Sequence, residues 1–176
     1  MPDRRAALAL ALGRGLAGLV ALGGLGGLSA CGFELRRAPE LRFSTVYLNG
    51  FQPRSALREE LRVNIDASRS TQVVEAPAQA QVIFDVLDEA REKSVVASTA
   101  AGQVRELQLR NRLRFRLRTL AGKDLIVPTE IVLTRDLSYS ESAALAKEHE
   151  EGLLYRAMQS DIVAQVMRRL AAVPAP

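Results

Sequence analysis

Apolar and polar residues alternate through residues 109–118, which read LRNRLRFRLR. Successive side chains of a strand point to opposite faces of a sheet, so this period of two predicts a strand whose two faces differ. One face carries five arginines, namely Arg110, Arg112, Arg114, Arg116 and Arg118. The other face carries mainly apolar side chains, including Leu113, Phe115 and Leu117. We expect other elements to cover the apolar face and to leave the arginine face open.

Further segments are rich in the β-branched and aromatic residues that favour strands. We predict strands at residues 43–49, 71–75, 81–98, 104–120 and 125–137. The third and fourth are separated by a turn in which Gly102 can adopt a positive φ, and a second turn at 121–124 follows the fourth. Pro128 cannot donate a backbone hydrogen bond, so it predicts that the last strand lies at a sheet edge or contains a bulge.

Two segments have apolar residues at every fourth position, which is the pattern of an amphipathic helix. In residues 54–65 the apolar positions are Leu57, Leu61 and Ile65. The second helix is expected to start near Ser140 and Glu141, and its apolar stripe consists of Leu154, Met158, Ile162, Val166 and Leu170. The apolar stripe of a helix and the apolar face of a sheet are stable in water only when they pack against each other. The predicted fold class is α+β, a two-layer sandwich in which two helices pack on one face of a mostly antiparallel sheet of four to five strands.

The chain begins with the basic sequence MPDRR and an apolar run over residues 6–28, the pattern of a secretory signal peptide. The run ends in LSAC, which resembles the lipobox of bacterial lipoproteins. We therefore expect residues 1–30 to be removed and Cys31 to carry N-acyl and S-diacylglycerol groups. Residues 31–42 then tether a single domain at 43–173. The alternative is a chance cysteine after an ordinary signal or anchor. By resemblance to bacterial sorting rules, Gly32 favours the outer membrane, with the protein on its periplasmic side.

Charge and composition narrow the classes of function. Without residues 1–30, the remaining 146 residues have 21 basic and 19 acidic side chains, so the working protein is barely basic. Tryptophan is absent and aromatics make up 5% of the chain, which argues against a stacking platform for nucleic acid bases. His149 is the only histidine, and no catalytic or metal-binding motif is found. The sequence predicts no enzymatic activity, no metal and no cofactor other than the lipid on Cys31.

Several short stretches together resemble a known family. Its members continue after the lipid-bearing cysteine with Gly-aromatic-His-Leu-Arg, and here Glu34 stands in place of the histidine. The other stretches are Gly102-Gln103, Glu106-Leu107-Gln108, Ala144-Leu145-Ala146-Lys147-Glu148 and Arg169-Leu170. The resemblance is to the LptE family of lipopolysaccharide-assembly lipoproteins, and it spans nearly all of the chain after the signal peptide.

The resemblance implies a non-enzymatic outer-membrane lipoprotein that helps to assemble and plugs the LptD β-barrel and contacts lipopolysaccharide during its transport to the cell surface. Family members contact lipopolysaccharide through basic side chains at two loops. One of these positions matches Lys147. At the other, before the Gly-Gln turn, this chain has Ala100 and Ala101, and Arg105 is the basic neighbour that could replace the contact. The alternative function is a lipoprotein adaptor subunit of another envelope lipid-transport or cell-wall complex.

The arginine face has three possible roles. It could be a solvated or partner-covered surface that is paired with carboxylates such as Asp85 and Glu130 on adjacent strands. It could contact an acidic barrel lining, or it could bind lipopolysaccharide directly, because guanidinium groups bind phosphates and carboxylates bidentately. Side chains on one face of a strand stand about 6.8 Å apart, so the arginines form a ladder rather than a pocket.

Overall fold

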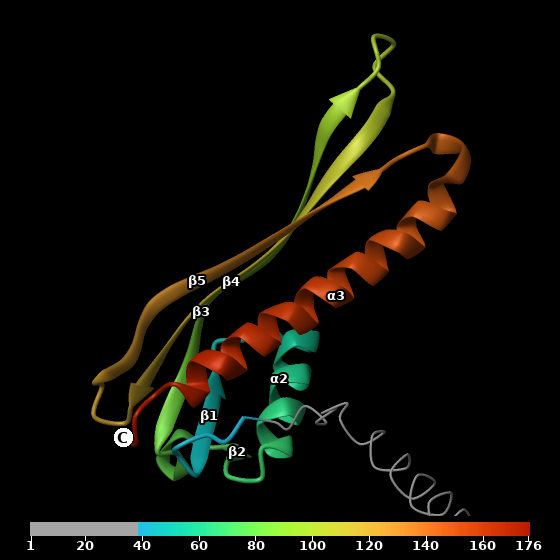
Figure 1. Cartoon of the computed structure of the whole chain (residues 1–176). Coiled ribbons are helices and arrows are strands. Elements are labelled where there is room, and N and C mark those ends of the chain that lie inside the picture. Colours follow the sequence, from blue (N-terminus) through green and yellow to red (C-terminus); the bar gives the residue numbers. More distant parts are fainter. Residues whose placement is uncertain (1–38) are drawn as a thin grey trace, which may run out of the picture. The chain divides into compact units, whose positions relative to one another are not determined.

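The computed structural model describes residues 39–176. The predicted signal peptide, Cys31 and the tether as far as Ala38 lie outside the described residues. The strands are β1 (Thr45–Asn49), β2 (Gln72–Val74), β3 (Val82–Ser98), β4 (Val104–Thr119) and β5 (Asp124–Ser138), and the α-helices are α2 (Ala56–Ala67) and α3 (Ala144–Ala171). Two 3₁₀ turns, η1 (Pro77–Gln79) and η2 (Glu141–Ala143), complete the order. Figure 1 shows one sheet with both α-helices on the same side of it.

The five strands form a single sheet in the order β2-β1-β3-β4-β5. The long strands β3, β4 and β5 pair antiparallel through the two turns that the sequence predicts, and Gly102 and Gly122 adopt φ angles of 80° and 88° there. The short strand β1 runs parallel to both β2 and β3. The predicted α+β fold, with two helices on a mostly antiparallel sheet of five strands, is confirmed.

The main core lies between the helices and the apolar face of β4. Leu113, Phe115 and Leu117 are buried there, and the Phe115 ring stacks on Phe84 of β3 with the ring centroids 4.9 Å apart. The helices contribute most of the predicted stripes, namely Leu57, Leu61 and Ile65 of α2 and Ile162, Val166 and Leu170 of α3, all of them buried. The start of the predicted α3 stripe differs: Leu154 is only partly buried, and it packs with the buried Met158 in a second cluster beside Leu107, Leu109 and Leu137. Burial of a large apolar side chain contributes about 1.5–3 kcal/mol, so these stripes hold the two layers together.

The start of α3 differs from the expectation. Ser140 precedes the 3₁₀ turn η2, and its side chain makes no capping hydrogen bond. Its Oγ instead lies 2.8 Å from Oγ of Ser142, and α3 proper begins at Ala144. A serine caps a helix when its hydroxyl accepts a hydrogen bond from a backbone N–H group in the first turn. Here the hydroxyl of Ser142 is the partner of the Ser140 hydroxyl instead.

A bulge in β3 changes which side chains face the helices. Register with β4 is broken between Val86 and Asp88, so Leu87 is skipped. Before the bulge, Phe84 and Val86 face the helices, and after it Glu89 and Lys93 do so, opposite the buried Leu113 and Leu109. The bulge therefore moves Asp88 and Glu92 to the arginine face. An extra residue in one strand of a pair has this effect because side chains alternate with a period of two.

The two edges of the sheet are unequal. The short strand β2 is the edge strand on one side of the sheet, and the long strand β5 is the edge strand on the other side. Pro128 lies in β5, and the β4–β5 register shifts beside it, between the pairs Phe115–Thr129 and Leu117–Ile126. Both features that the sequence predicted for this proline, an edge position and an irregular register, are present.

Candidate functional site

Buried Asp85 organises one end of the arginine face. Its Oδ2 accepts hydrogen bonds from Nε of Arg116 at 3.0 Å and from Nε of Arg118 at 2.6 Å. Its Oδ1 accepts from Nδ2 of Asn49 on β1 at 2.8 Å. One carboxylate thus joins three strands.

The pKa of Asp85 reflects two opposing effects. Burial raises the pKa by disfavouring the charged form, whereas the hydrogen bonds from Arg118, Asn49 and Arg116 lower it. The hydrogen bonds outweigh burial, so the pKa lies below its usual value of 3.8. The carboxylate is therefore ionised at neutral pH and offsets part of the charge of the arginine ladder.

Arg112 lies at the centre of a second set of ion pairs. Its Nη2 is 3.1 Å from Asp88 and 3.5 Å from Glu92, both on β3, and its Nη1 is 3.9 Å from Glu130 on β5. Glu92 also lies 3.8 Å from Nη1 of Arg110. Carboxylates of both neighbouring strands thus surround the middle of the ladder.

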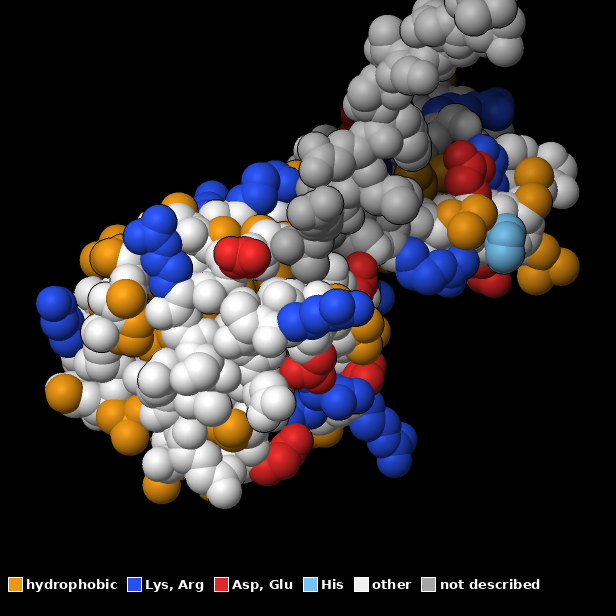
Figure 2. Space-filling view, turned by 60° about the horizontal axis from the view of Figure 1, so that its bottom comes forward, with side chains coloured by type: hydrophobic (Ala, Val, Ile, Leu, Met, Phe, Trp, Pro, Cys, Tyr) orange, Lys and Arg blue, Asp and Glu red, His pale blue; other side chains and the backbone are white. Residues whose placement is uncertain are grey.

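Arg114 differs from the other four arginines. Asp88 and Glu130 are its register partners, yet within residues 39–176 its exposed side chain makes no hydrogen bond or ion pair. Four of the five arginines are therefore neutralised within the sheet. On the side of the molecule that Figure 2 draws, basic and acidic side chains also lie near one another in places.

Sequence reasoning named Asp85 and Glu130 as partners of the ladder but missed Asp88 and Glu92. The signal was present in the pattern of β3, where the apolar alternation of Val82, Phe84 and Val86 stops at Leu87. A break of that kind indicates a bulge, but it does not tell which charged residues lie on which side of the sheet after it.

Arg105 and Lys147 come from distant segments, and the fold brings them to the same end of the sheet. The carbonyl of Arg105 accepts a hydrogen bond from the backbone N–H of Tyr139 at 2.8 Å. One residue before Tyr139, the Oγ of Ser138 accepts from Nζ of Lys147 at 3.0 Å. Arg105, through its backbone, and Lys147, through its ammonium group, thus contact the same stretch of chain, where β5 leads into α3.

The two cations are not equally available. Lys147 also donates to Glu150 at 2.9 Å, and its side chain is 20% exposed. Arg105 is exposed, and among the described residues no side-chain hydrogen bond or ion pair holds its guanidinium group. A ligand can therefore reach Arg105 freely but must compete with Glu150 for Lys147.

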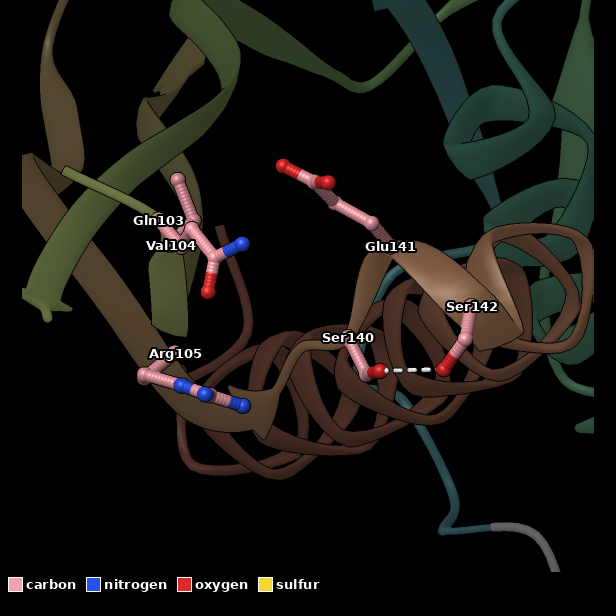
Figure 3. Close-up of a pocket in the computed structure, with 6 residues that line it drawn as sticks. All are labelled: Gln103, Val104, Arg105, Ser140, Glu141 and Ser142. Carbon is pink, nitrogen blue, oxygen red and sulfur yellow. Dashed lines mark hydrogen bonds between the residues drawn. The ribbon is translucent and has the colours of Figure 1, made fainter. Parts of the chain in front are cut away.

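Arg105 lines a hollow of about 240 Å³ between the start of β4 and η2. Figure 3 shows the Arg105 guanidinium group, the Gln103 amide and the Glu141 carboxylate around this space, with the hydroxyls of Ser140 and Ser142 beside it. Pockets for drug-sized ligands measure about 300–1,000 Å³, so this hollow is large enough for a phosphate or one sugar ring but not for a whole lipid.

Other features bear on metals and membranes. In the part of the chain that the structure describes, no three histidine, cysteine or carboxylate side chains are grouped as metal ligands. His149 is exposed on α3. Within residues 39–176, neither α-helix has the length and apolar character needed to cross a membrane.

Comparison with known families decides the identity. A model of the family described as LptE, lipopolysaccharide-assembly, matches residues 43–170. The chain belongs to the LptE family. This confirms the resemblance seen in the sequence, and it gives the chain a role in lipopolysaccharide assembly. LptE proteins are non-enzymatic assembly lipoproteins.

Solved structures of lipoproteins have the same fold. Lipoprotein B from Nitrosomonas europaea is 33% identical, covers 80% of this chain and 91% of its own, and superposes with a TM-score of 0.67. Rare lipoprotein B from Shewanella oneidensis is 19% identical, covers 73% and 95%, and has a TM-score of 0.62. A minor lipoprotein from Acinetobacter baumannii is 18% identical, covers 75% and 93%, and has a TM-score of 0.61. Comparison with curated proteins gave no match.

Proposed function

We propose that this LptE-family protein is an outer-membrane lipoprotein, held by acyl groups on Cys31 at the periplasmic side, that plugs an LptD-like barrel and contacts lipopolysaccharide. The family match over residues 43–170 carries this proposal. Further support comes from the lipobox-like LSAC sequence and from the similar structures, which are described as lipoproteins. Several buried acyl chains would make the anchoring effectively permanent, since each methylene contributes about 0.8 kcal/mol.

The proposed lipopolysaccharide contact consists of Arg105 and Lys147. Lipopolysaccharide carries phosphate groups, and a guanidinium group binds phosphate bidentately while an ammonium group acts as a point charge. The Arg105 backbone and the Lys147 side chain hydrogen-bond to the neighbouring residues Tyr139 and Ser138 at this end of the sheet, and in this proposal both cations act on one head group. A bound phosphate would displace Glu150 from Lys147.

The arginine face has a different role in this proposal. Four of its arginines already have carboxylate partners within the sheet, and a phosphate would have to compete with those partners. We assign the face to stabilising the long strands and to polar contact with surrounding water or barrel wall, with Arg114 as its unpaired member among the described residues.

The test of the lipopolysaccharide contact is a binding titration with the Arg105→Ala/Lys147→Ala double variant. The matched control is Arg110→Ala/Lys123→Ala, which removes one cation from β4 and one from the turn between β4 and β5. The first variant should bind lipopolysaccharide at least tenfold more weakly, with a smaller salt dependence, while the control binds like wild type. Equal binding by both variants would contradict the assigned contact.

The anchor and the barrel are tested in cells. Cys31→Ser should leave an unprocessed precursor without acyl groups, and its fractionation with the outer membrane after normal cleavage would contradict the lipid anchor. Purification of the wild-type protein from solubilised outer membrane should yield a large β-barrel partner, identified by mass. The Arg105→Ala/Lys147→Ala variant should retain that partner.

A further inference from the structure

Three uncharged segments meet at the end of the sheet where β3 begins. They are residues 76–81, 119–122 and 172–176, which read APAQAQ, TLAG and AVPAP. We call these residues the neutral end. Figure 1 shows the start of β3, the turn between β4 and β5 and the C-terminus at this end of the molecule, and the start of α3 at the other end. Charged residues make up 25% of the chain, so the neutral end differs from the rest of the surface.

The neutral end surrounds a hollow of about 400 Å³. Leu120 lines the hollow and is 49% exposed, and Ala121 and Pro176 beside it are exposed as well. Figure 2, in which the bottom of Figure 1 comes forward, shows mainly white and orange atoms over the middle of this end. Blue and red side chains lie mostly toward its margins. The exposed apolar side chains are therefore grouped around one hollow.

Charged residues adjoin the three segments along the chain at Glu75, Arg118 and Lys123. Arg118 is already paired with the buried Asp85. Lys123 is exposed at the turn that follows Leu120, and a lysine can keep its ammonium group in water while its stem covers apolar surface. The neutral end is thus an apolar surface with a cation at its rim.

The first described residues pack at the neutral end. The backbone N–H of Ser44 donates to Oε1 of Gln81 at 2.7 Å, and Gln81 lines the hollow. Eight positions separate Cys31 from Pro39, where the described part of the chain begins. A chain spans at most about 3.6 Å per residue, so acyl groups on Cys31 would be attached within about 29 Å of Pro39. The proposed anchor therefore keeps the neutral end near the membrane.

We propose that the neutral end rests on the phospholipids of the periplasmic leaflet of the outer membrane. Grouped apolar side chains on a protein surface mark contacts with membranes or proteins, and the short tether favours the membrane here. Leu120 and Pro176 supply apolar surface for the lipid, and Lys123 attracts the phosphates of anionic lipids. This inference rests on the proposed lipid anchor and adds a second contact, made by the folded domain itself.

The absence of tryptophan from the chain permits a direct test. Leu120→Trp places the only tryptophan beside the hollow. The matched control is Leu145→Trp, because Leu145 is 84% exposed but lies near the start of the 28-residue helix α3. At about 1.5 Å per residue, roughly 39 Å of helix separate it from the end of α3 at Ala171. Both variants carry the same added side chain, so a general affinity of tryptophan for lipid affects them equally.

Each protein is purified from membranes in its processed form, and mass spectrometry measures the acyl groups on Cys31. It is reconstituted, alone and together with the co-purified barrel, in vesicles of phosphatidylethanolamine and phosphatidylglycerol. Half of the samples contain lipids with brominated acyl chains, which quench tryptophan at short range. Circular dichroism checks the fold of each variant.

Fluorescence of Leu120→Trp should fall about twofold or more in brominated vesicles, with and without the barrel, because its indole lies at the membrane interface. Leu145→Trp should change little. Adding Ala121→Asp to Leu120→Trp should remove most of the quenching, since a carboxylate is costly among acyl chains.

Four outcomes overturn the inference. Equal quenching of both reporters, or none in an acylated Leu120→Trp protein, removes the contact and leaves the anchor intact. Unchanged quenching after Ala121→Asp means that the tether alone brings this end near the lipid. Quenching that disappears only when the barrel is present means that the barrel covers the neutral end. Absence of acyl groups on Cys31 contradicts the proposed anchor itself, and the inference with it.

Discussion

Asp85 of β3 accepts its shorter hydrogen bond, 2.6 Å, from Arg118 of β4, which is its diagonal neighbour rather than its register partner. The register partner, Arg116, donates to the same oxygen at 3.0 Å. Long side chains reach diagonal positions on a sheet, so one carboxylate can bind two arginines that would otherwise repel each other.

Replacing Asp85 with Asn should therefore destabilise the protein by about 2–3 kcal/mol, because it removes a buried charge from two charge-assisted hydrogen bonds. This loss is smaller than the usual cost of breaking a fully buried ion pair, because the side chains of both arginines remain partly exposed to solvent. Chemical denaturation of the purified protein measures the change, and Asp136→Asn at an exposed position is the control. A loss below about 0.5 kcal/mol, the usual range for a surface substitution, would show that Asp85 has little structural role.

The same group predicts an acid-dependent loss of stability. The pKa of Asp85 is lower in the folded protein than in the unfolded chain. The ionised carboxylate therefore contributes its full share to the free energy of unfolding at pH values above the pKa of the unfolded chain. This share is lost as the pH falls through the pKa of the folded protein. Unfolding free energy should therefore decrease below about pH 4, near the ordinary pKa of an aspartate, and the decrease should be smaller in Asp85→Asn. The comparison is made from neutral pH down to about pH 2, and parallel pH profiles would rule out this assignment.

Arg114 and Arg116 offer a matched pair on one strand face. Arg116→Gln breaks the ion pair with Asp85 and should cost about 1 kcal/mol, while Arg114→Gln should stay within about 0.5 kcal/mol of wild type. Added salt should reduce the difference between the two variants, since it screens exposed ion pairs. Equal losses for both would mean that Arg114 has a partner of similar strength.

Among the glycines of residues 39–176, Gly50 is the one least tolerant of a side chain. Its φ is 78°, and a Cβ there would lie 2.3 Å from the carbonyl oxygen of Val86, at the bulge of β3. Gly50→Ala should cost about 3 kcal/mol or more, from left-handed strain together with displacement of backbone. Gly102→Ala is the control, since φ is 80° but no atom lies within 4 Å of its Cβ, and it should cost about 1–2 kcal/mol. Thermal unfolding of both variants tests the difference.

Local patterns in the sequence were sufficient to predict the elements and their buried faces. Alternation in β4 identified Leu113, Phe115 and Leu117 as buried, and four-residue spacing identified the stripes that contain Leu61 and Ile162. Both inferences depend only on the geometry of a single strand or helix, which repeats about every 2.0 or 3.6 residues. The turn at Gly102 and the edge position of Pro128 were predictable for the same local reason.

Only the tertiary structure determined which side chains from distant parts of the sequence contact one another. Two acidic residues, Asp88 and Glu92, reach the arginine face only because of the bulge at Leu87, and Ser140 does not cap α3 because its hydroxyl meets Ser142. Arg105 and Lys147, 42 positions apart in the sequence, share one end of the sheet because β5 runs back along β4 before α3 begins. Pairing between distant strands sets register, and a single inserted residue reverses which face a side chain occupies. Local periodicity determines the faces of each element, but only the assembled sheet determines which charges meet.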